Sequence, residues 1–581
     1  MPQLKSLYPT IPHVQATNFY DFLFGLPAVK DLSDFTLYID GLTGETRRFR
    51  AFVDRVSECS SALASSEVSG GLDIKFGRQE LVGIFSENCL EYPTIVFALL
   101  KLAVPFALLP AYSTTAEFLS LLRLSKVTRL FVSPALIRIA RVAAREAGFS
   151  EDRIYILQGD VQGFKNVGNL IEGTRSTTRK EPVPPSIGDN DLAYLSFSSG
   201  TSGLPKAVMI SHRNLISSFL QTMIIGREYA KVAKPRPLQT PEGTRVVFGF
   251  LPFYHVTAFH LSILRIFTPP TTVIVLPRWN LDKVLDLITK YRVTHLGLVP
   301  SMAHQLVNSP RLATTDLSSI ISFGTGAAHL PTEERQKLIK YMPNVGPFAG
   351  GYGMTECTVS AMVSPLPGLF DGHFSRDALL SMTGILNPSV EARIIRDDGS
   401  DAEYDEPGEL LLRGPNIALG YWRNENATAE SFLADGWLRT GDRFRVEPTG
   451  AFYYVDRIKD TLKVSGTQVS PSEIEHVLLQ HPEKLITDVS VAGVPGTRFS
   501  DEKVPRAWVV LSTAGQRRGE EASLAALDDW VRSQMAKHKW LRGGIQAVDQ
   551  IPKSPTGKVL RRVLQEEYQR EASAVGEKAK L

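Results

Sequence analysis

The sequence predicts an α/β protein with a large N-terminal domain of βαβ layers, built on mainly parallel sheets, and a small α+β C-terminal domain. Three observations indicate this. The 581 residues exceed the usual size of one domain. Short apolar runs alternate with helical stretches over about the first 450 residues, and this alternating pattern ends near Asp456. We therefore expect domains at 1–455 and 456–570, followed by a flexible polar tail at 571–581.

The apolar runs of the N-terminal part have the length of buried strands. They lie at residues 81–86, 129–134, 193–197, 245–253, 271–277 and 295–301, and helical stretches precede or follow several of them. The longest apolar run, residues 94–112, contains Lys101, Pro105 and Pro110. A charge and two prolines favour a buried helix that ends near Val104, then a strand, over a membrane span. We expect a soluble protein without a transmembrane segment.

The C-terminal part has its own pattern of elements. Helices are expected at 471–482 and 524–538, and strands at 488–495 and 506–512. This is enough for a compact domain with its own core.

Composition excludes some classes of function. The net charge is +3 and the basic and acidic residues are mixed, so nothing indicates a nucleic-acid surface. The three cysteines, Cys59, Cys89 and Cys357, are too few and too far apart for a disulfide framework or a metal cluster, which fits a reducing compartment.

The strongest chemical motif is a loop between two apolar strands at residues 194–212. Glycines let backbone N–H groups approach an anion, hydroxyls add neutral donors, and a lysine adds positive charge. The pattern therefore predicts an anion cradle of the kind triphosphate chemistry requires. No Gly-Lys-Ser/Thr opens a helix here, so it is not a Walker loop. The residues of this cradle are Ser198, Ser199, Gly200, Thr201, Ser202, Gly203 and Lys206.

Together with five further motifs, this loop resembles the adenylate-forming superfamily, which includes acyl-CoA synthetases, 4-coumarate:CoA ligases and firefly luciferase. The further motifs are GYGMTE (351–356), GELLLRGPNIALGYW (408–422), GWLRTGD (436–442), DRIKDTLKVSGTQVSPSEIE (456–475) and PKSPTGK (552–558). They occur in the order and at the spacing of the superfamily, over roughly residues 35–565. The resemblance implies the adenylate-forming fold with a mobile C-terminal lid. It also implies an ATP-dependent ligase that forms an acyl-adenylate and passes the acyl group to coenzyme A, releasing AMP and pyrophosphate.

The resemblance also implies a nucleotide site. Thr355 and Glu356 would lie beside the α-phosphate and its Mg²⁺, with Thr201 and Glu356 as metal ligands, and oxygen ligands suit this hard cation. Tyr352 would stack on adenine, and Asp442 would accept the ribose hydroxyls. Besides the cradle, the implied nucleotide-binding residues are Gly326, Ala327, Ala328, Gly351, Tyr352, Gly353, Met354, Thr355, Asp442, Arg457, Lys459 and Gly466.

Three lysines of the C-terminal part match positions that the superfamily uses. Lys558 would bridge the carboxylate and the α-phosphate during adenylation, where both reactants are anions. Lys459 matches the hinge, and Lys463 matches the lysine presented after the lid rotates for thioester formation. Ser465 stands where plant ligases usually carry a second lysine. Gly350 stands where glutamine is common, and His329 stands where proline is common. Whether these three changes alter the recognition of CoA or of the acyl group stays open.

The acyl site is expected near residues 252–262. His255 matches a family histidine whose movement opens the channel for the carboxylate or the coenzyme. Residues 252–262 include no acid that could pair with an ammonium group, which argues against an α-amino acid. The neighbouring side chains are apolar, so we expect an apolar acid, which can be aryl, medium-chain or a specialised polyketide-type acid. These neighbours are Phe253, Val256, Ala258, Phe259 and Phe323.

The chain ends in Ala579-Lys580-Leu581, close to the Ser-Lys-Leu peroxisomal address. This predicts a peroxisomal location and a peroxisomal import receptor as partner. CoA ligation has two alternatives. The first is an adenylating enzyme that loads the phosphopantetheine of a carrier protein, or a luciferase-like oxidase. The second is a non-catalytic acid-binding relative. Neither is favoured, because no carrier domain is attached and Thr201, Glu356, Asp442 and Lys558 are all present.

Overall fold

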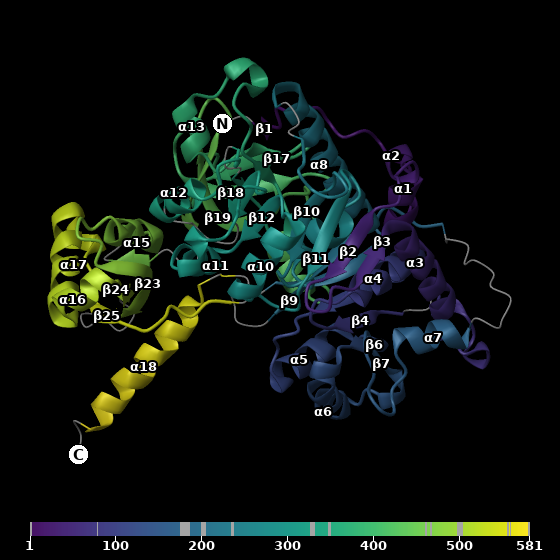
Figure 1. The fold of residues 1–581 in the computed structure, drawn as a ribbon. Coiled ribbons are helices and arrows are strands. Elements are labelled where there is room, and N and C mark those ends of the chain that lie inside the picture. Colours follow the sequence, from purple (N-terminus) through teal and green to yellow (C-terminus); the bar gives the residue numbers. More distant parts are fainter. Residues whose placement is uncertain are drawn as a thin grey trace.

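The computed structural model describes residues 3–77, 80–174, 186–198, 205–233, 237–325, 332–346, 350–458, 462–464, 467–496, 503–554, 557 and 559–578. A large N-terminal domain and a smaller C-terminal domain lie side by side (Figure 1). The predicted α/β class with its two domains is therefore confirmed, whereas the boundary at 455/456 stays a prediction.

One parallel sheet carries the start of the phosphate-loop motif. Its order is β7-β6-β4-β5-β8-β9, and every neighbouring pair is parallel except β8 and β9. The central strands are buried along their whole length, as expected for a sheet covered by helices on both faces. The strands are β4 (Val82–Phe85), β5 (Phe106–Leu109), β6 (Arg129–Val132), β7 (Ile154–Ile156), β8 (Leu192–Ser198) and β9 (Lys206–Ser211).

The apolar run at 94–112 is a buried helix followed by a strand, as predicted. Helix α4 (Glu91–Lys101) is buried at every position and ends three residues before Val104, and β5 follows it. The charged ends of α4 are paired: Glu91 accepts hydrogen bonds from Arg47 and Arg55 at 2.9 and 2.8 Å. Among the residues that the structure describes, no helix combines the length and the apolar character that a membrane span needs.

A second sheet, of order β13-β12-β10-β11-β2-β3, is parallel except for β3. The expected runs at 245–253 and 295–301 form shorter strands, because a turn follows Gly249 and Pro300 begins a helix. The strands are β2 (Thr36–Asp40), β3 (Thr46–Arg48), β10 (Arg245–Gly249), β11 (Thr271–Val275), β12 (His295–Leu298) and β13 (Ser322–Thr325).

The last part of the N-terminal domain is antiparallel, which the βαβ pattern did not predict. The five-stranded sheet has the order β1-β17-β18-β19-β20, and a small sheet has the order β14-β15-β16. The strands are β1 (Leu4–Lys5), β14 (Gly351–Tyr352), β15 (Met362–Val363), β16 (Ile385–Leu386), β17 (Glu391–Ile395), β18 (Gly408–Arg413), β19 (Leu438–Val446) and β20 (Phe452–Arg457).

Helices surround these sheets. They are α1 (Phe19–Gly25), α2 (Pro27–Lys30), α3 (Phe49–Ala64), α5 (Thr115–Ser125), α6 (Ile137–Ala147), α7 (Val167–Gly173), α8 (His212–Val232), α9 (Val256–Phe259), α10 (Leu281–Tyr291), α11 (Pro300–Val307), α12 (Thr332–Lys340), α13 (Arg376–Ser381) and α14 (Glu425–Ser431). The 21-residue α8 begins with a capping box, in which the hydroxyl of Ser211 accepts from the backbone N–H of Asn214 and the Asn214 side chain accepts in return.

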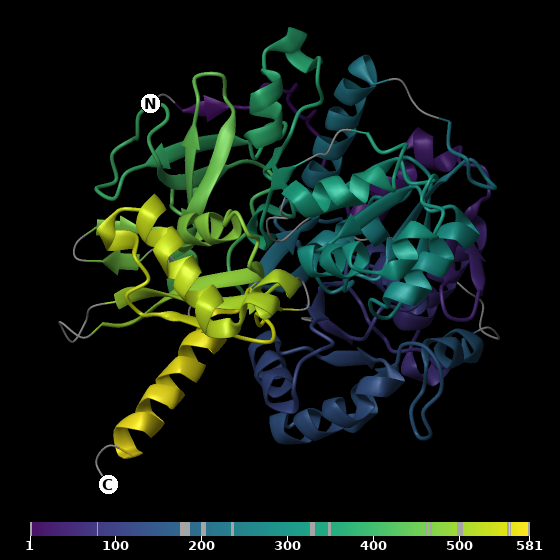
Figure 2. The ribbon, with the colours of Figure 1, turned by 60° about the vertical axis from the view of Figure 1, so that its left-hand side comes forward.

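The C-terminal domain has its own core and contains all the elements expected there. Its helices and strands form one group, yellow-green to yellow in Figure 2. The antiparallel pair β23 and β24 is extended by β25, and the hairpin of β21 and β22 packs on β24. The elements are β21 (Leu462–Val464), β22 (Thr467–Val469), α15 (Pro471–Leu479), β23 (Ile486–Pro495), β24 (Lys503–Leu511), α16 (Thr513–Arg518), α17 (Glu520–Gln534) and β25 (Ile545–Ala547).

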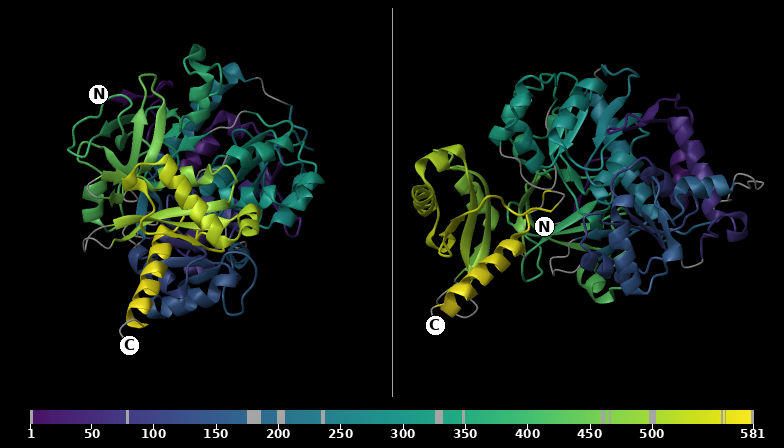
Figure 3. Two further views of the ribbon diagram at one scale, coloured as in Figure 1. Left: turned by 90° about the vertical axis from the view of Figure 1, so that its left-hand side faces the viewer. Right: turned by 60° about the horizontal axis from the view of Figure 1, so that its bottom comes forward.

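The flexible tail expected at residues 571–581 stays a prediction, although residues 571–578 are helical in the structure. Helix α18 runs over Arg561–Lys578 and projects outward from the C-terminal domain (Figure 3). Its first turns are anchored, because Arg561 pairs with Glu475 at 2.7 Å and Leu564 is buried against β23 and β24. Arginine, glutamate and alanine, which favour helix, then continue it. Ala579, Lys580 and Leu581 lie outside the described residues.

Candidate active site

The two strands of the phosphate-loop motif, β8 and β9, are antiparallel neighbours. Ser198 at the end of β8 pairs directly with Lys206 at the start of β9, so the chain between them is held at its base. The GYW end of the 408–422 motif lies along the free edge of β9: the N–H of Met209 donates to the carbonyl of Gly420, and the N–H of Trp422 donates to the carbonyl of Ala207. Two motifs far apart in sequence are therefore joined at one sheet edge.

Glu356 lies at this junction. Its side chain is almost completely buried, at 5% exposure. One carboxylate oxygen, Oε1, accepts hydrogen bonds from the hydroxyls of Tyr421 at 2.9 Å and Ser198 at 3.3 Å. The second oxygen, Oε2, accepts none from any described residue. The ammonium group of Lys206 lies 4.6 Å from the centre of the Tyr421 ring. Among the described residues, the acid is therefore fixed through Oε1 alone.

The turn that presents Glu356 depends on one glycine. A Cβ atom on Gly353 would lie 1.7 Å from the carbonyl oxygen of Val359, so no larger residue fits. The next residues form a short 3₁₀ turn over Thr355–Cys357, with Thr355 partly exposed. Burial raises the pKa of the Cys357 thiol to about 12, so this cysteine is protonated and is no nucleophile at neutral pH.

Asp442 is held beside Tyr352. The acid is 4% exposed, and its Oδ2 accepts the phenolic hydrogen of Tyr352 at 2.6 Å. Its Oδ1 lies 3.2 Å from Nε of Arg457, which is the residue opposite it in the β19–β20 pair. Gly441 has a φ of +70°, a conformation that favours glycine. Burial, and then the nearby Asp442 charge, raise the pKa of Tyr352, so the phenol stays a donor. The structure thus brings together the predicted adenine and ribose residues.

His255 precedes α9 and is partly exposed. Burial lowers its pKa to about 4, so the ring is neutral at neutral pH. Its ring forms no hydrogen bond with the described residues. The neighbours expected to line an acyl site, Phe253, Val256, Ala258, Phe259 and Phe323, are all buried. Contact of these five side chains with an acyl group stays a prediction.

The C-terminal domain approaches the carboxyl ends of the second sheet. A Cβ atom on Gly557 would lie 3.0 Å from the Cβ of Val299, the residue that follows β12. Nearby, Lys553 pairs with Asp488 at 2.5 Å. The hydrogen bond with Glu334, and also the Asp488 charge, raise the pKa of His304 on α11. The segment next to Lys558 therefore lies at the edge where the chain leaves β12.

Several predicted site residues lie outside the described residues. They are Ser199, Gly200, Thr201, Ser202, Gly203, Gly326, Ala327, Ala328, Lys459, Gly466 and Lys558, together with His329 and Ser465. Only the backbone of Lys463, in β21, is described. The roles of all these residues stay predictions.

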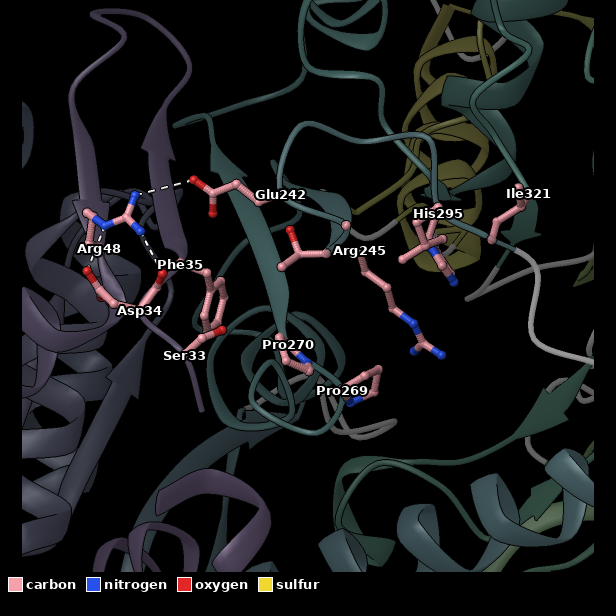
Figure 4. A pocket seen from close by; sticks show the side chains of 13 residues that line it. Ser33, Asp34, Phe35, Arg48, Glu242, Arg245, Pro269, Pro270, His295 and Ile321 are labelled. Carbon is pink, nitrogen blue, oxygen red and sulfur yellow. Dashed lines mark hydrogen bonds and ion pairs between the residues drawn. The ribbon is translucent and has the colours of Figure 1, made fainter. Parts of the chain in front are cut away.

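A cavity of about 590 Å³ opens at the opposite, amino-terminal edge of the second sheet (Figure 4). Its lining includes Arg245 and His295, the first residues of β10 and β12, and Pro270 just before β11. At one end Arg48 pairs with Asp34 and Glu242. None of the residues of the Glu356 cluster lines this cavity, and it lies at the edge of the sheet opposite to the one where ligands of parallel sheets usually bind.

Sequence reasoning missed the role of Tyr421. The residue was quoted only as part of the 408–422 motif, although it supplies the shorter of the two hydrogen bonds to Glu356. Its position in a glycine-containing segment after a strand could have marked this tyrosine as a candidate hydrogen-bond donor. Nothing local, however, indicates that this segment pairs with β9.

Comparison with known proteins places the chain in a family. The model of the AMP-binding enzyme family matches residues 31–422, and that of the AMP-binding enzyme C-terminal domain matches residues 473–558. The chain therefore belongs to the AMP-binding, adenylate-forming enzymes, and the suspected resemblance is confirmed.

Individual relatives agree over most of the chain. A putative acyl-coenzyme A synthetase of Emericella nidulans is 34% identical over 514 residues, 87% of each chain. A probable CoA ligase, CCL5, of Humulus lupulus is 31% identical over 91% of this chain and 89% of its own. Among solved structures, ATP-bound MatB from Rhodopseudomonas palustris has a TM-score of 0.77 at 24% identity, covering 95% of this chain and 99% of its own, which supports the fold.

Proposed function

We propose that this protein is an ATP-dependent carboxylic acid:CoA ligase. It joins a carboxylate to the α-phosphate of ATP, releases pyrophosphate, and transfers the acyl group from AMP to the thiol of coenzyme A. The observation that carries the proposal is the Glu356 cluster, in which one acid, two hydroxyls and Lys206 meet at the hairpin of the phosphate-loop motif. Relatives named as acyl-CoA synthetase and CoA ligase support the acceptor.

The first half-reaction brings two anions together, so the site must supply fixed geometry and positive charge. Lys206 at the base of the hairpin is one such cation. Lys558 is proposed as the second, bridging the attacking carboxylate and the α-phosphate. The approach of Gly557 to Val299 supports this, because Gly557 precedes Lys558 in the sequence and lies beside the residue that follows β12.

Glu356 fits the Mg²⁺ that such chemistry uses. Its Oε1 is engaged by two hydroxyls, whereas Oε2 accepts no hydrogen bond from a described residue and is a suitable oxygen ligand. Thr201 is proposed as the second ligand. The ion would offset phosphate charge, while Tyr421 and Ser198 hold the carboxylate in place.

Asp442 and Tyr352 are proposed to bind the nucleoside. Both oxygens of Asp442 already accept interactions from Tyr352 and Arg457, but each oxygen has a second lone pair for a ribose hydroxyl. The Tyr352 ring packs against Phe444 in a T-shaped pair, with ring centres 4.8 Å apart and ring planes at 72°. A fixed, partly exposed ring of this kind suits stacking on a base.

The substrate is proposed to be an apolar acid other than an α-amino acid, because residues 252–262 carry no acid for an ammonium group. The experiment is incubation with ATP, Mg²⁺, CoA and a panel of acids, with mass spectrometry of the products. A parallel arm replaces CoA with a phosphopantetheinylated carrier protein. Acyl-CoA with AMP is the expected result. Acylation of the carrier alone would support the alternative, and ADP formation would contradict the assignment.

We further propose that Ala579-Lys580-Leu581 direct the protein to peroxisomes through the import receptor. The tripeptide follows in sequence on α18, which projects outward from the C-terminal domain (Figure 1). Deleting these three residues should leave activity intact and disperse a tagged protein into the cytosol of its host. A full-length protein that is already cytosolic would exclude this address.

A further inference from the structure

Arg265 is a partly buried cation that the proposed chemistry does not use. Its Nη2 donates to the hydroxyl of Ser218 at 2.6 Å and to the carbonyl of Ser218 at 3.2 Å. Its Nε is buried and has no hydrogen-bond acceptor. Within the described part of the chain, no carboxylate forms an ion pair with this guanidinium. Two donors, Nε and Nη1, therefore have no protein acceptor there.

The groups around Arg265 do not neutralise it. Tyr194 and His260 share a hydrogen bond of 3.1 Å between the phenolic oxygen and Nε2. Burial raises the pKa of Tyr194 and lowers that of His260, so both are uncharged at neutral pH. Burial lowers the pKa of Arg265 itself to about 10, which leaves it charged. A buried charge without a counter-ion is unfavourable, and an anionic ligand would relieve this.

Arg265 is accessible along one face of the segment that follows His255. Here α9 continues into a π-helical turn over His260–Leu264. Thr257 and Arg265 are partly exposed and Leu261 is 53% exposed, whereas the residues between them are buried. The spacing of four residues puts these three side chains on one face. From His255 onward this face offers a hydroxyl, then an apolar side chain, then a cation. A π-helical turn is also frequent at functional sites.

This face is joined to the Glu356 cluster. The hydroxyl of Ser218 on α8, which accepts from Arg265, donates to the carbonyl of Thr358 at 2.8 Å. Thr358 is two residues beyond Glu356, and Tyr194 lies on β8, which ends at Ser198. Arg265 is therefore linked to the segment after Glu356 through a single intermediate, the hydroxyl of Ser218.

We propose that Arg265 determines substrate specificity by binding a second carboxylate at the far end of the acid, so that the preferred substrates are dicarboxylic acids with an apolar middle. A guanidinium with free donors suits a carboxylate, and Leu261 suits the apolar chain. Residues 255 and 265 are at most about 15 Å apart along a helix axis, a span that suits medium-length diacids. The inference rests on the proposed function and deepens it.

The test compares pairs of acids with equal carbon number, from hexanoate and adipate to dodecanoate and dodecanedioate. Pyrophosphate release gives kcat/KM for each acid. The wild type should prefer the diacid by roughly 10- to 100-fold. Arg265→Met should abolish this preference and leave the monoacids close to wild type, and Arg265→Lys should keep part of it. Arg245→Met, at the separate cavity, is the matched control and should leave the preference unchanged.

Three outcomes would overturn the inference. In the first, the wild type shows no preference for diacids. In the second, Arg265→Met lowers kcat/KM equally for both members of each pair. In the third, Arg265→Met changes only the KM for CoA. The last two would mean a structural or coenzyme-binding role. If the wild type activates monoacids without discrimination, only this inference fails. If it activates no acid, the proposed function fails as well. If Arg265→Met does not fold, the wild-type preference and Arg265→Lys decide.

Discussion

At the scale of single residues, the candidate site depends on hydrogen bonds that fix carboxylates. Glu356 receives two hydroxyls on one oxygen, and Asp442 receives a phenol and a guanidinium. Hydrogen bonds to a charged group contribute about 1.5–3 kcal/mol each, more than those between neutral groups. The hydroxyls therefore orient the acids before any nucleotide binds.

Tyr421→Phe tests this arrangement. It removes the hydroxyl that donates to Glu356 but keeps the ring beside Lys206. Acid-dependent exchange of pyrophosphate into ATP should fall by roughly 10-fold or more, because the carboxylate loses its shorter hydrogen bond. Tyr404→Phe, at a half-exposed position away from the site, is the control. Unchanged exchange in Tyr421→Phe would show that the phenol does not position the acid.

At the scale of elements, the C-terminal domain presents two lysines from different places. Lys463 belongs to the β21–β22 hairpin, whereas Lys558 follows Gly557, which lies beside Val299. The resemblance implies that Lys558 acts in adenylation and Lys463 in thioester formation, so the domain would change orientation between the two half-reactions.

Alanine variants of the two lysines should separate the half-reactions. Lys558→Ala should lose adenylate formation by several kcal/mol, on the order of losing a main transition-state donor. It should still convert synthetic acyl-adenylate and CoA into thioester. Lys463→Ala should retain pyrophosphate exchange and lose thioester formation. Each variant is assayed from free acid with ATP and from adenylate with CoA. Equal impairment of both variants in both assays would contradict a lid with two orientations.

At the scale of the whole molecule, buried neutral histidines make the folded state sensitive to acid. Burial lowers the pKa of His212 to about 3 and that of His295 to about 4. The unfolded chain binds these protons near pH 6.5, whereas the folded chain does not. Stability is therefore complete above about pH 6.5 and falls as the pH drops from there toward the folded pKa.

His212→Asn should weaken this dependence. Nδ1 of His212 accepts from the N–H of Phe19 at 3.1 Å, a bond that an asparagine oxygen can replace without titrating. With the pKa values above, this histidine costs about 2 kcal/mol of stability at pH 5. The thermal-unfolding midpoint is measured at pH 7 and pH 5 for both proteins. The drop should be smaller in the variant, and equal drops would exclude His212 as a source.

Most of the fold could be predicted from local patterns. Alternating strands and helices gave the parallel sheets, and the run interrupted by Pro105 gave α4 and β5. The antiparallel strands β17 to β20 were missed, because their pairing joins residues that no local periodicity relates. The helix beyond residue 570 was missed because polar composition was taken as disorder, although the chain is anchored by Leu564 and then favours helix.

The candidate site could be predicted only through motifs. The resemblance pointed to Glu356, Asp442 and Tyr352, and the structure brings the last two into contact. No role was predicted for Tyr421 or Arg265, because their roles depend on tertiary contacts, such as those with β9 and Ser218.

The central claim is that the acid is activated as an adenylate before it reaches CoA, and the fate of the carboxylate oxygens tests it most directly. The enzyme is supplied with ATP, Mg²⁺, CoA and an acid in which both carboxylate oxygens are the heavy isotope. The masses of the products are then measured by mass spectrometry. Attack on the α-phosphate followed by thiol attack on the acyl carbon predicts that AMP carries one labelled oxygen and the thioester keeps the other. Unlabelled AMP, or ADP with labelled phosphate, would contradict the account.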